Sequence, residues 1–462
     1  MKFQNGLMTG IILVAGCTDA DNAKLPAAKS GEDPVAVIDL PDTSTAITEQ
    51  SAAEKSTEPS ANVMTGEAKS GPKQLPLAEQ EARAAIQALG GRFIRMEAID
   101  LSDMLITDAE LEHLKGLTSL EELNLADTLI TDSGLQHLEG LSNLQSLNLF
   151  GTQITDAGLA RLKGLSSLRD LNLSDTLITD SGLEYLEGLT SLETLHFFAT
   201  QIEGPGLESL EGLTSLGQLY LTDTQITDAG LKHLSGLLSL ESLHLSGTQV
   251  TSAGLEYLKA LTSLRHLWLH DTQINDDGLE HLKELTSLEE LYLSGTQITD
   301  AGLEHFKALT GLKDLWLHDT QINGEGLEHL KGLSGLTILH LSGTRVTDAG
   351  LEHLKTLTSL NHLWLHNTPI TDSGLAHLQG LSNLAELYLD GTSITDTGLE
   401  HLKTLTSLTF LWLPGTQITD DGLEHLKRHT NLKFLDLTGT QISDAGLEEL
   451  RAALPECDVV SN

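Results

Sequence analysis

The feature that most constrains the fold of this chain is a repeat of 24 residues that runs without an insertion from Met96 to Pro455. Leucine opens every unit after the first, at residues 120, 144, 168, 192, 216, 240, 264, 288, 312, 336, 360, 384, 408 and 432. Fifteen units that keep one register over 360 residues belong to one continuous structure, although 462 residues would otherwise suggest about three domains. The sequence therefore predicts a single solenoid over residues 96–455.

Each unit follows the pattern L-x-x-L-x-L-x-x-T-x-I-T-D-x-G-L-x-x-L-x-x-L. The alternating leucines at positions four and six predict a short strand, and those at positions 16 and 19 have helical spacing. Thr or Asn at position 12 and Asp at position 13 are typical of a helix start, where an acceptor and a negative charge suit the exposed N–H groups. We interpret the twelve aspartates at position 13 as helix caps rather than a calcium site, because calcium prefers about six to eight oxygen ligands.

These motifs resemble the leucine-rich repeat family over residues 96–455, and the T-D-x-G-L variant is similar to the long arrays of bacterial envelope proteins. The resemblance implies an α/β solenoid shaped as a horseshoe, with a parallel β-sheet on the concave face and helices on the convex face. Thr occupies fourteen of the fifteen ninth positions, where the family commonly carries Asn, which suggests a ladder of hydroxyl groups. A helical pattern from Leu77 and the strand-like Phe93 to Met96 indicate an N-terminal cap over residues 77–95, and residues 456–462 are expected to form a C-terminal cap or tail.

The first residues resemble a bacterial lipoprotein signal. Lys2 precedes an apolar stretch from Leu7 to Gly16, and small residues lead into Cys17. By this resemblance residues 1–16 are removed, Cys17 carries lipid that anchors the protein to the membrane, and the protein lies in the bacterial cell envelope. Residue 18 is not Asp, which favours the outer membrane. A plain secretory signal is the alternative; a membrane helix is not, because the apolar stretch is too short to span about 30 Å of hydrocarbon.

Composition limits the remaining functions. Residues 17–76 are rich in Ala, Ser, Thr, Pro, Glu and Lys and lack a sustained period, so we expect a lipidated, disordered tether.

The formal net charge of -39 repels phosphate backbones and excludes nucleic acid as a partner. Cys17 and Cys457 are the only cysteines, so no disulfide framework is expected. No activated nucleophile, phosphate loop or metal triad appears, and we predict neither enzymatic activity nor a cofactor or metal.

The units differ from one another at position five, which projects from the strand opposite to the buried leucines at positions four and six. Aromatic and imidazole rings fill most of this column, and all four tryptophans of the chain belong to it: Asp100, Asn124, Asn148, Asn172, His196, Tyr220, His244, Trp268, Tyr292, Trp316, His340, Trp364, Tyr388, Trp412 and Asp436. Position seven adds His270, His318 and His366. The partner-binding residues are therefore predicted to be Tyr220, His244, Trp268, His270, Tyr292, Trp316, His318, His340, Trp364, His366, Tyr388 and Trp412.

A protein or peptide partner is the leading hypothesis for this surface, because its area and varied side chains suit an extended epitope. Two alternatives stay open: a glycan that stacks on the rings, and a structural envelope spacer that binds nothing tightly. Stacked rings could also serve only to stabilise the sheet. Against that, the first units carry Asn in the same column, and replacing Trp316 and Trp364 is expected to cost little folding stability because the rings face away from the leucine core.

Two further sets of histidines have a plainer interpretation. Ten lie at position 18 on the helices, beside Glu at position 17 in most units, and we interpret them as solvated residues rather than a metal or pH-sensing stripe. His270 and Asp271 have the residue types of an acid–base pair, as do His318 and Asp319. Adjacent residues of one strand point to opposite sides unless the strand ends there, so we assign no catalytic role to these pairs.

Overall fold

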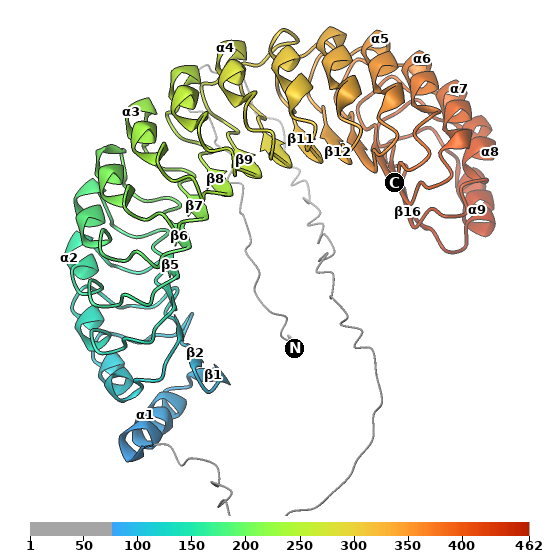
Figure 1. Cartoon of the computed structure of the whole chain (residues 1–462). Coiled ribbons are helices and arrows are strands. Elements are labelled where there is room, and N and C mark those ends of the chain that lie inside the picture. The colour runs from blue at the N-terminus through green and yellow to red at the C-terminus, as the bar shows by residue number, and fades with distance from the viewer. Residues whose placement is uncertain (1–75, 462) are drawn as a thin grey trace, which may run out of the picture. The chain divides into compact units, whose positions relative to one another are not determined.

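The computed structural model describes residues 76–461. The predicted lipoprotein signal, Cys17 and the tether up to residue 75 lie outside the described residues. The repeat units form a curved solenoid in which each 24-residue unit makes one coil (Figure 1). Strands line the inner side of the arc and short helical turns line its outer side, so the fold is the predicted α/β horseshoe.

The inner side is one continuous sheet in the described residues. Strands of neighbouring coils pair in parallel at a fixed register of 24 residues, so that Leu291 lies beside Leu315 and Leu315 beside Leu339. The strands are β1 (Arg92–Arg95), β2 (Ala98–Asp100), β3 (Glu122–Asn124), β4 (Ser146–Asn148), β5 (Asp170–Asn172), β6 (Thr194–His196), β7 (Gln218–Tyr220), β8 (Ser242–His244), β9 (His266–Trp268), β10 (Glu290–Tyr292), β11 (Asp314–Trp316), β12 (Ile338–His340), β13 (His362–Trp364), β14 (Glu386–Tyr388), β15 (Phe410–Trp412), β16 (Phe434–Asp436) and β17 (Asp458–Val460).

The outer side contains much less α-helix than the leucine spacing suggests, because most coils carry one α-helical turn, a 3₁₀ segment, or both. The α-helices are α1 (Leu77–Ala88), α2 (Asp156–Leu159), α3 (Asp228–Leu231), α4 (Asp276–Leu279), α5 (Asp348–Leu351), α6 (Asp372–Leu375), α7 (Asp396–Leu399), α8 (Leu423–Leu426) and α9 (Asp444–Ala453). The 3₁₀ segments are η1 (Glu110–Gly116), η2 (Gly134–His137), η3 (Asp180–Tyr185), η4 (Pro205–Leu210), η5 (Lys232–Leu234), η6 (Ser252–Leu258), η7 (Glu280–Leu282), η8 (Gly302–Ala308), η9 (Glu325–Gly332), η10 (Glu352–Thr356), η11 (Ala376–Leu378), η12 (Glu400–Thr404) and η13 (Asp420–Gly422). A 3₁₀ turn rises about 2.0 Å per residue against about 1.5 Å in an α-helix, so it spans the coil with fewer residues.

Both ends of the leucine core are covered. At the N-terminal end α1 buries Ile86, and β1 pairs with β2 in the antiparallel direction. At the C-terminal end α9 is longer than the turns of the repeats, and Arg451 in it donates a hydrogen bond to the carbonyl of Val459 at 3.0 Å. Between the ends the repeat leucines are fully buried, as at Leu303, and each contributes roughly 2 kcal/mol.

Position 13 aspartates join neighbouring coils, a role that helix capping alone does not describe. Asp132 accepts hydrogen bonds from the backbone N–H of Thr155 at 2.8 Å and from its hydroxyl at 2.6 Å. The Thr155 hydroxyl in turn accepts from the N–H of Ala157 and so caps the start of α2. The same pairing joins Asp108 to Thr131, Asp156 to Thr179, Asp228 to Thr251, Asp276 to Thr299, Asp348 to Thr371, Asp372 to Thr395, Asp396 to Thr419 and Asp420 to Ser443. This is the polar ladder of the solenoid.

The ninth-position threonines do not form the suggested ladder of hydroxyls. Each donates within its own coil to the carbonyl three residues earlier, as Thr320 does to Leu317 at 2.6 Å. The hydroxyl therefore closes the turn after the strand, and the link between coils passes through the aspartates.

Asp276→Ala is expected to lower the free energy of unfolding by about 1–3 kcal/mol, because two hydrogen bonds from Thr299 to a carboxylate are lost. Asp444 is the matched control, since it occupies position 13 of the last unit and has no following repeat unit. Asp444→Ala is expected to cost only about 0.5 kcal/mol through the lost charge at the start of α9. Urea unfolding of the full chain measures both, and equal shifts in the two midpoints would contradict the ladder.

Candidate partner-binding face

The rings at position five form one uninterrupted stack along the inner side of the sheet, which we call the ring column. Neighbouring ring centroids lie 3.9 to 5.2 Å apart from the first member to the last. Its members are His196, Tyr220, His244, Trp268, Tyr292, Trp316, His340, Trp364, Tyr388 and Trp412. Nine of the predicted binding residues belong to the column, and His196, which the sequence analysis left out of the binding set, begins it.

The strand register explains why the column is continuous. Position five ends each three-residue strand, and parallel pairing places Trp316 beside Tyr292 on one side and His340 on the other. The leucines at positions four and six point into the core and fix the opposite direction for the ring between them. Most of the rings remain partly exposed, whereas His244 and Tyr388 are buried.

The rings mostly stack face to face, which decides what they can offer a ligand. The interplanar angle is 7° between His196 and Tyr220 and 13° between Tyr388 and Trp412. In the stacked pairs each ring therefore covers a face of its neighbour, and Phe434 packs at 4.9 Å on the ring of Trp412 at the end of the column. A sugar ring stacks on a free aromatic face, so this geometry disfavours the glycan alternative.

The stack changes direction around His340. Trp316 and Trp364 belong to coils on either side of His340, yet the centroids of their indole rings lie only 6.0 Å apart. His318 and His366 flank His340 at 4.1 and 5.7 Å, and together these five residues form what we call the His340 cluster. Burial, and the neighbouring imidazoles after it, hold the pKa of His340 far below its usual value.

Polar atoms in the His340 cluster lack partners. The Nε2 of His340 lies 2.6 Å from the Ser342 hydroxyl, but its Nδ1 is buried without a hydrogen bond in the described residues. The same holds within the cluster for the indole nitrogen of Trp316 and Nδ1 of His366, and outside the cluster for the indole nitrogen of Trp268. Buried polar groups normally have partners, so the cluster retains unused hydrogen-bonding capacity.

The three predicted position-seven histidines lie beside the column, just beyond the strands. The Nδ1 of His270 lies 2.8 Å from the hydroxyl of Ser246, and that of His318 lies 2.7 Å from Ser294, each in the preceding coil. Burial lowers the pKa of both imidazoles. Asp271 follows His270 in a left-handed turn with φ of 55°, and the hydrogen-bond partner of His270 is the serine. The turn thus does not assemble an acid–base pair.

A second row of side chains, which the sequence analysis missed, lies at position three of the strands. His266 contacts Glu290 at 3.2 Å, and His362 contacts Glu386 at 3.4 Å. Burial and the adjacent Glu290 raise the pKa of Asp314 to about 6. Side chains two residues apart in a strand lie on the same face, so positions three and five face the same way. The alternation that identified the rings therefore also predicts this second row.

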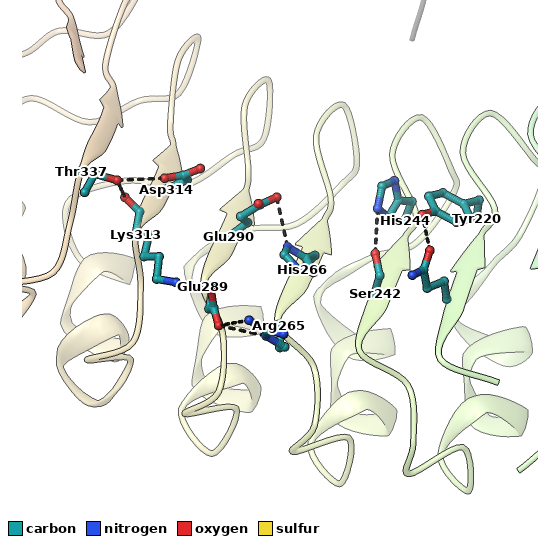
Figure 2. A network of polar contacts seen from close by, with 11 residues as sticks. Tyr220, Ser242, His244, Arg265, His266, Glu289, Glu290, Lys313, Asp314 and Thr337 are labelled. Carbon is teal, nitrogen blue, oxygen red and sulfur yellow. Dashed lines mark hydrogen bonds and ion pairs between the residues drawn. The ribbon is translucent and has the colours of Figure 1, made fainter. Parts of the chain in front are cut away.

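Position two carries an ion network at the edge of that row. Glu289 accepts from Arg265 at 2.9 Å and contacts Lys313 at 2.5 Å, so one carboxylate pairs with both basic groups (Figure 2). Figure 2 also shows the His266–Glu290 contact and the hydrogen bond from Thr337 to Asp314 on the neighbouring strands. An open hollow of about 690 Å³ adjoins the same edge in later coils, and His362 of the third-position row lines it.

The geometry of the described residues limits other kinds of site. Among residues 76–461 no three His, Cys, Asp or Glu side chains are grouped so that they could hold a metal ion. Within the same range no helix combines the length and apolarity needed to cross a bilayer.

Comparisons with known proteins agree on the repeat. Two family models described as leucine rich repeats match the sequence, one at residues 94–154, 239–298 and 286–346 and the other at residues 164–186 and 428–450. A sequence comparison with curated proteins gives no match.

Solved structures with the same architecture include an internalin of Listeria monocytogenes, which is 26% identical with a TM-score of 0.59. The alignment covers 72% of this chain and 93% of the internalin. A leucine-rich repeat protein of Leptospira interrogans is 20% identical with a TM-score of 0.50, over 84% of this chain and 99% of that protein. A TDR receptor is 18% identical with a TM-score of 0.52, over 79% of this chain and 67% of the receptor. The last two are similar in fold.

Proposed function

This chain is a leucine-rich repeat protein, and on that premise we propose that it binds a protein or peptide partner along the ring column and the three position-seven histidines. The observation that carries the proposal is an unbroken row of rings, most of them partly exposed, on a sheet face that nothing covers in the described residues. Aromatic residues in such a setting supply contact area at low entropic cost. The role proposed is binding, with no catalytic step.

The first coils support this proposal because they build the same strand without rings. The side chains of Asn124, Asn148 and Asn172 accept hydrogen bonds from backbone N–H groups two residues later, at 2.9 to 3.1 Å. Trp has no acceptor to make that bond. Later coils therefore replace a group that stabilises the strand end with a ring, which favours a role in recognition beyond folding.

The dimensions suit an extended polypeptide. Ten rings make nine steps of about 4.8 Å, so the column is roughly 43 Å long. An extended peptide advances about 3.3 Å per residue, and about twelve residues would cover most of that length. Backbone amides and apolar side chains can lie on ring edges, which need no free aromatic face.

A displayed library of random 12-residue peptides tests the proposed function. Selection on the full chain is followed by counter-selection on the variant Trp316→Asn/Trp364→Asn. Asn is chosen as the replacement because it occupies position five in earlier coils of the same solenoid. We expect peptides that bind the wild-type chain and lose at least tenfold in affinity on the variant. A pool that binds both chains equally would reject the ring column as the site, and a selection that yields no binding peptide would favour the structural spacer.

We further propose, from the sequence before the repeats, that Cys17 is lipidated and anchors the protein in the bacterial cell envelope, with the outer membrane favoured. Cys17→Ser is expected to leave the solenoid folded and to shift the protein from the membrane fraction to an unprocessed or soluble form. Incorporation of a labelled fatty acid measures the modification, and a wild-type chain that takes up no label contradicts it.

A further inference from the structure

The concave face has an unusual distribution of charge. Positions three, five, seven and eight of all fifteen units contain no Lys or Arg, although the chain has 27 basic residues. The same positions in the central coils contain nine carboxylates: Asp170, Asp175, Asp223, Asp271, Glu290, Asp314, Asp319, Glu386 and Asp390. Basic residues near this face stand at position two, where Arg265 and Lys313 are already paired with Glu289.

These carboxylates lie on both sides of the ring column. Position eight, in the turn after each strand, carries Asp in every second coil from Asp127 to Asp319, at intervals of about 10 Å. Position three, on the other side of the rings, carries Glu290, Asp314 and Glu386. The rings therefore run between two acidic rows.

The eighth-position row has no partner of opposite charge in the described residues, whereas Glu290 and Glu386 of the third-position row each contact a histidine. In the described part of the chain, none of the eighth-position aspartates from Asp127 to Asp319 takes part in an ion pair, and the backbone there adopts positive φ. Burial, with repulsion from Asp271 as a further cause, raises the pKa of Asp223. Asp314 and Glu290 pair directly across neighbouring strands. Like charges held side by side are relieved when an opposite charge arrives.

We propose that the partner segment is cationic, with Lys or Arg side chains that reach the two acidic rows while their stems lie across the ring edges. This inference rests on the proposed function, because it describes what the concave face binds. Lys and Arg carry long apolar stems that pack on apolar surface while the charged head stays in polar surroundings. The rings match the apolar stem of a Lys or Arg side chain, and the carboxylates match its charged head. Complementary charge also disfavours acidic polypeptides as competitors.

Two fluorescent 12-residue probes test the inference: a fourfold Lys-Ser-Pro repeat and its Gln-Ser-Pro counterpart. Because the whole chain is acidic, the test must separate non-specific attraction of a cationic probe to the chain from binding at the concave face. Asp271→Asn/Asp319→Asn removes two charges from the concave face, and Asn367 shows that Asn fits the same turn with φ of 54°. Glu304→Gln/Glu328→Gln removes two charges from exposed positions on the helical side and is the matched control.

At about 150 mM salt, where the Debye length is about 8 Å, we expect the lysine probe to bind at least tenfold more tightly than the glutamine probe. The concave aspartate variant is expected to weaken that binding at least fivefold and the convex control less than twofold. Equal weakening by both variants, or equal binding of both probes, would overturn the inference. If library peptides depend on the rings but show no enrichment in Lys or Arg, the cationic inference fails while the proposed function stands; if no peptide depends on the rings, the proposed function itself fails.

Discussion

Lowering the pH from 7 to 5 is expected to reduce the free energy of unfolding by several kcal/mol through the imidazoles of the ring column. Burial lowers the pKa of His196 to about 4 and that of His244 to about 3, and it lowers the pKa of His340 further. An unfolded histidine takes up a proton near pH 6.5, whereas these folded residues stay neutral. Stability is therefore complete above about pH 6.5 and falls as the pH drops towards the folded pKa, by about 2 kcal/mol per residue at pH 5.

Asp314 acts in the opposite direction. Its folded pKa of about 6 lies above the unfolded value, so protonation on acidification favours the folded chain by about 1 kcal/mol at pH 5. Relief of the net charge of -39 works the same way. The imidazole contribution must therefore be isolated by comparing variants rather than read from the wild-type profile alone.

Urea unfolding of His244→Asn at pH 7 and pH 5 provides that comparison. The variant is expected to lose about 2 kcal/mol less than the wild type between the two pH values, because one buried imidazole is gone. Tyr292→Asn is the control: it removes a ring from the same column without removing an imidazole, and its pH dependence is expected to follow the wild type. If the free energy of unfolding of His244→Asn falls between pH 7 and pH 5 by as much as that of the wild type, His244 is protonated in the folded chain at pH 5.

Trp316→Asn/Trp364→Asn is expected to reduce both affinity and stability, with the larger loss in affinity. Central aromatic anchors contribute about 2 kcal/mol or more each, so binding of a selected peptide is expected to weaken by about 4 kcal/mol. The two rings also contact Tyr292, His340, Tyr388 and each other. At about 0.5–1.5 kcal/mol per ring pair, offset by the backbone hydrogen bonds that Asn makes, the stability cost is about 3 kcal/mol.

This stability cost is larger than the sequence alone suggests, because the expectation of a small cost treated the rings as isolated from one another. Calorimetric titration with the selected peptide and urea unfolding measure the two losses. Asn124→Ala/Asn148→Ala, in the same column but outside the rings, is expected to leave affinity nearly unchanged. A tryptophan variant whose folded fraction binds with wild-type affinity would assign the rings to the scaffold only.

The fold was largely predictable because a strict repeat gives every unit the same structure and therefore fixes how neighbouring units pair. Once Leu291 and Leu315 are recognised as equivalent, parallel pairing of their strands and the alignment of position five follow from the register. The amount of α-helix was not predictable from leucine spacing, since both α and 3₁₀ turns place such leucines on one side. The link from Asp132 to Thr155 was missed because capping within one coil explains the same residues.

The candidate site was predictable in its membership but not in its geometry. The column from Tyr220 to Trp412 could be read from one position of the repeat, whereas the angles between its rings depend on the rotamers of neighbours on both sides. The approach of Trp316 to Trp364 across two coils, with centroids 6.0 Å apart, follows from the side-chain arrangement and not from the repeat pattern. The carboxylates at position three share the face of the rings by the period of the strand, but their contacts with His266 and His362 depend on side-chain rotamers.

Photo-crosslinking tests the central claim most directly, because it locates a bound polypeptide on the surface of the full chain. A library-selected 12-residue peptide carrying a benzophenone side chain is bound, irradiated and mapped by mass spectrometry of the proteolysed complex. We expect crosslinks to strand and turn residues at positions three, five and seven between residues 218 and 414. Crosslinks confined to the helical turns of the convex side, or spread evenly over all fifteen units, would contradict it.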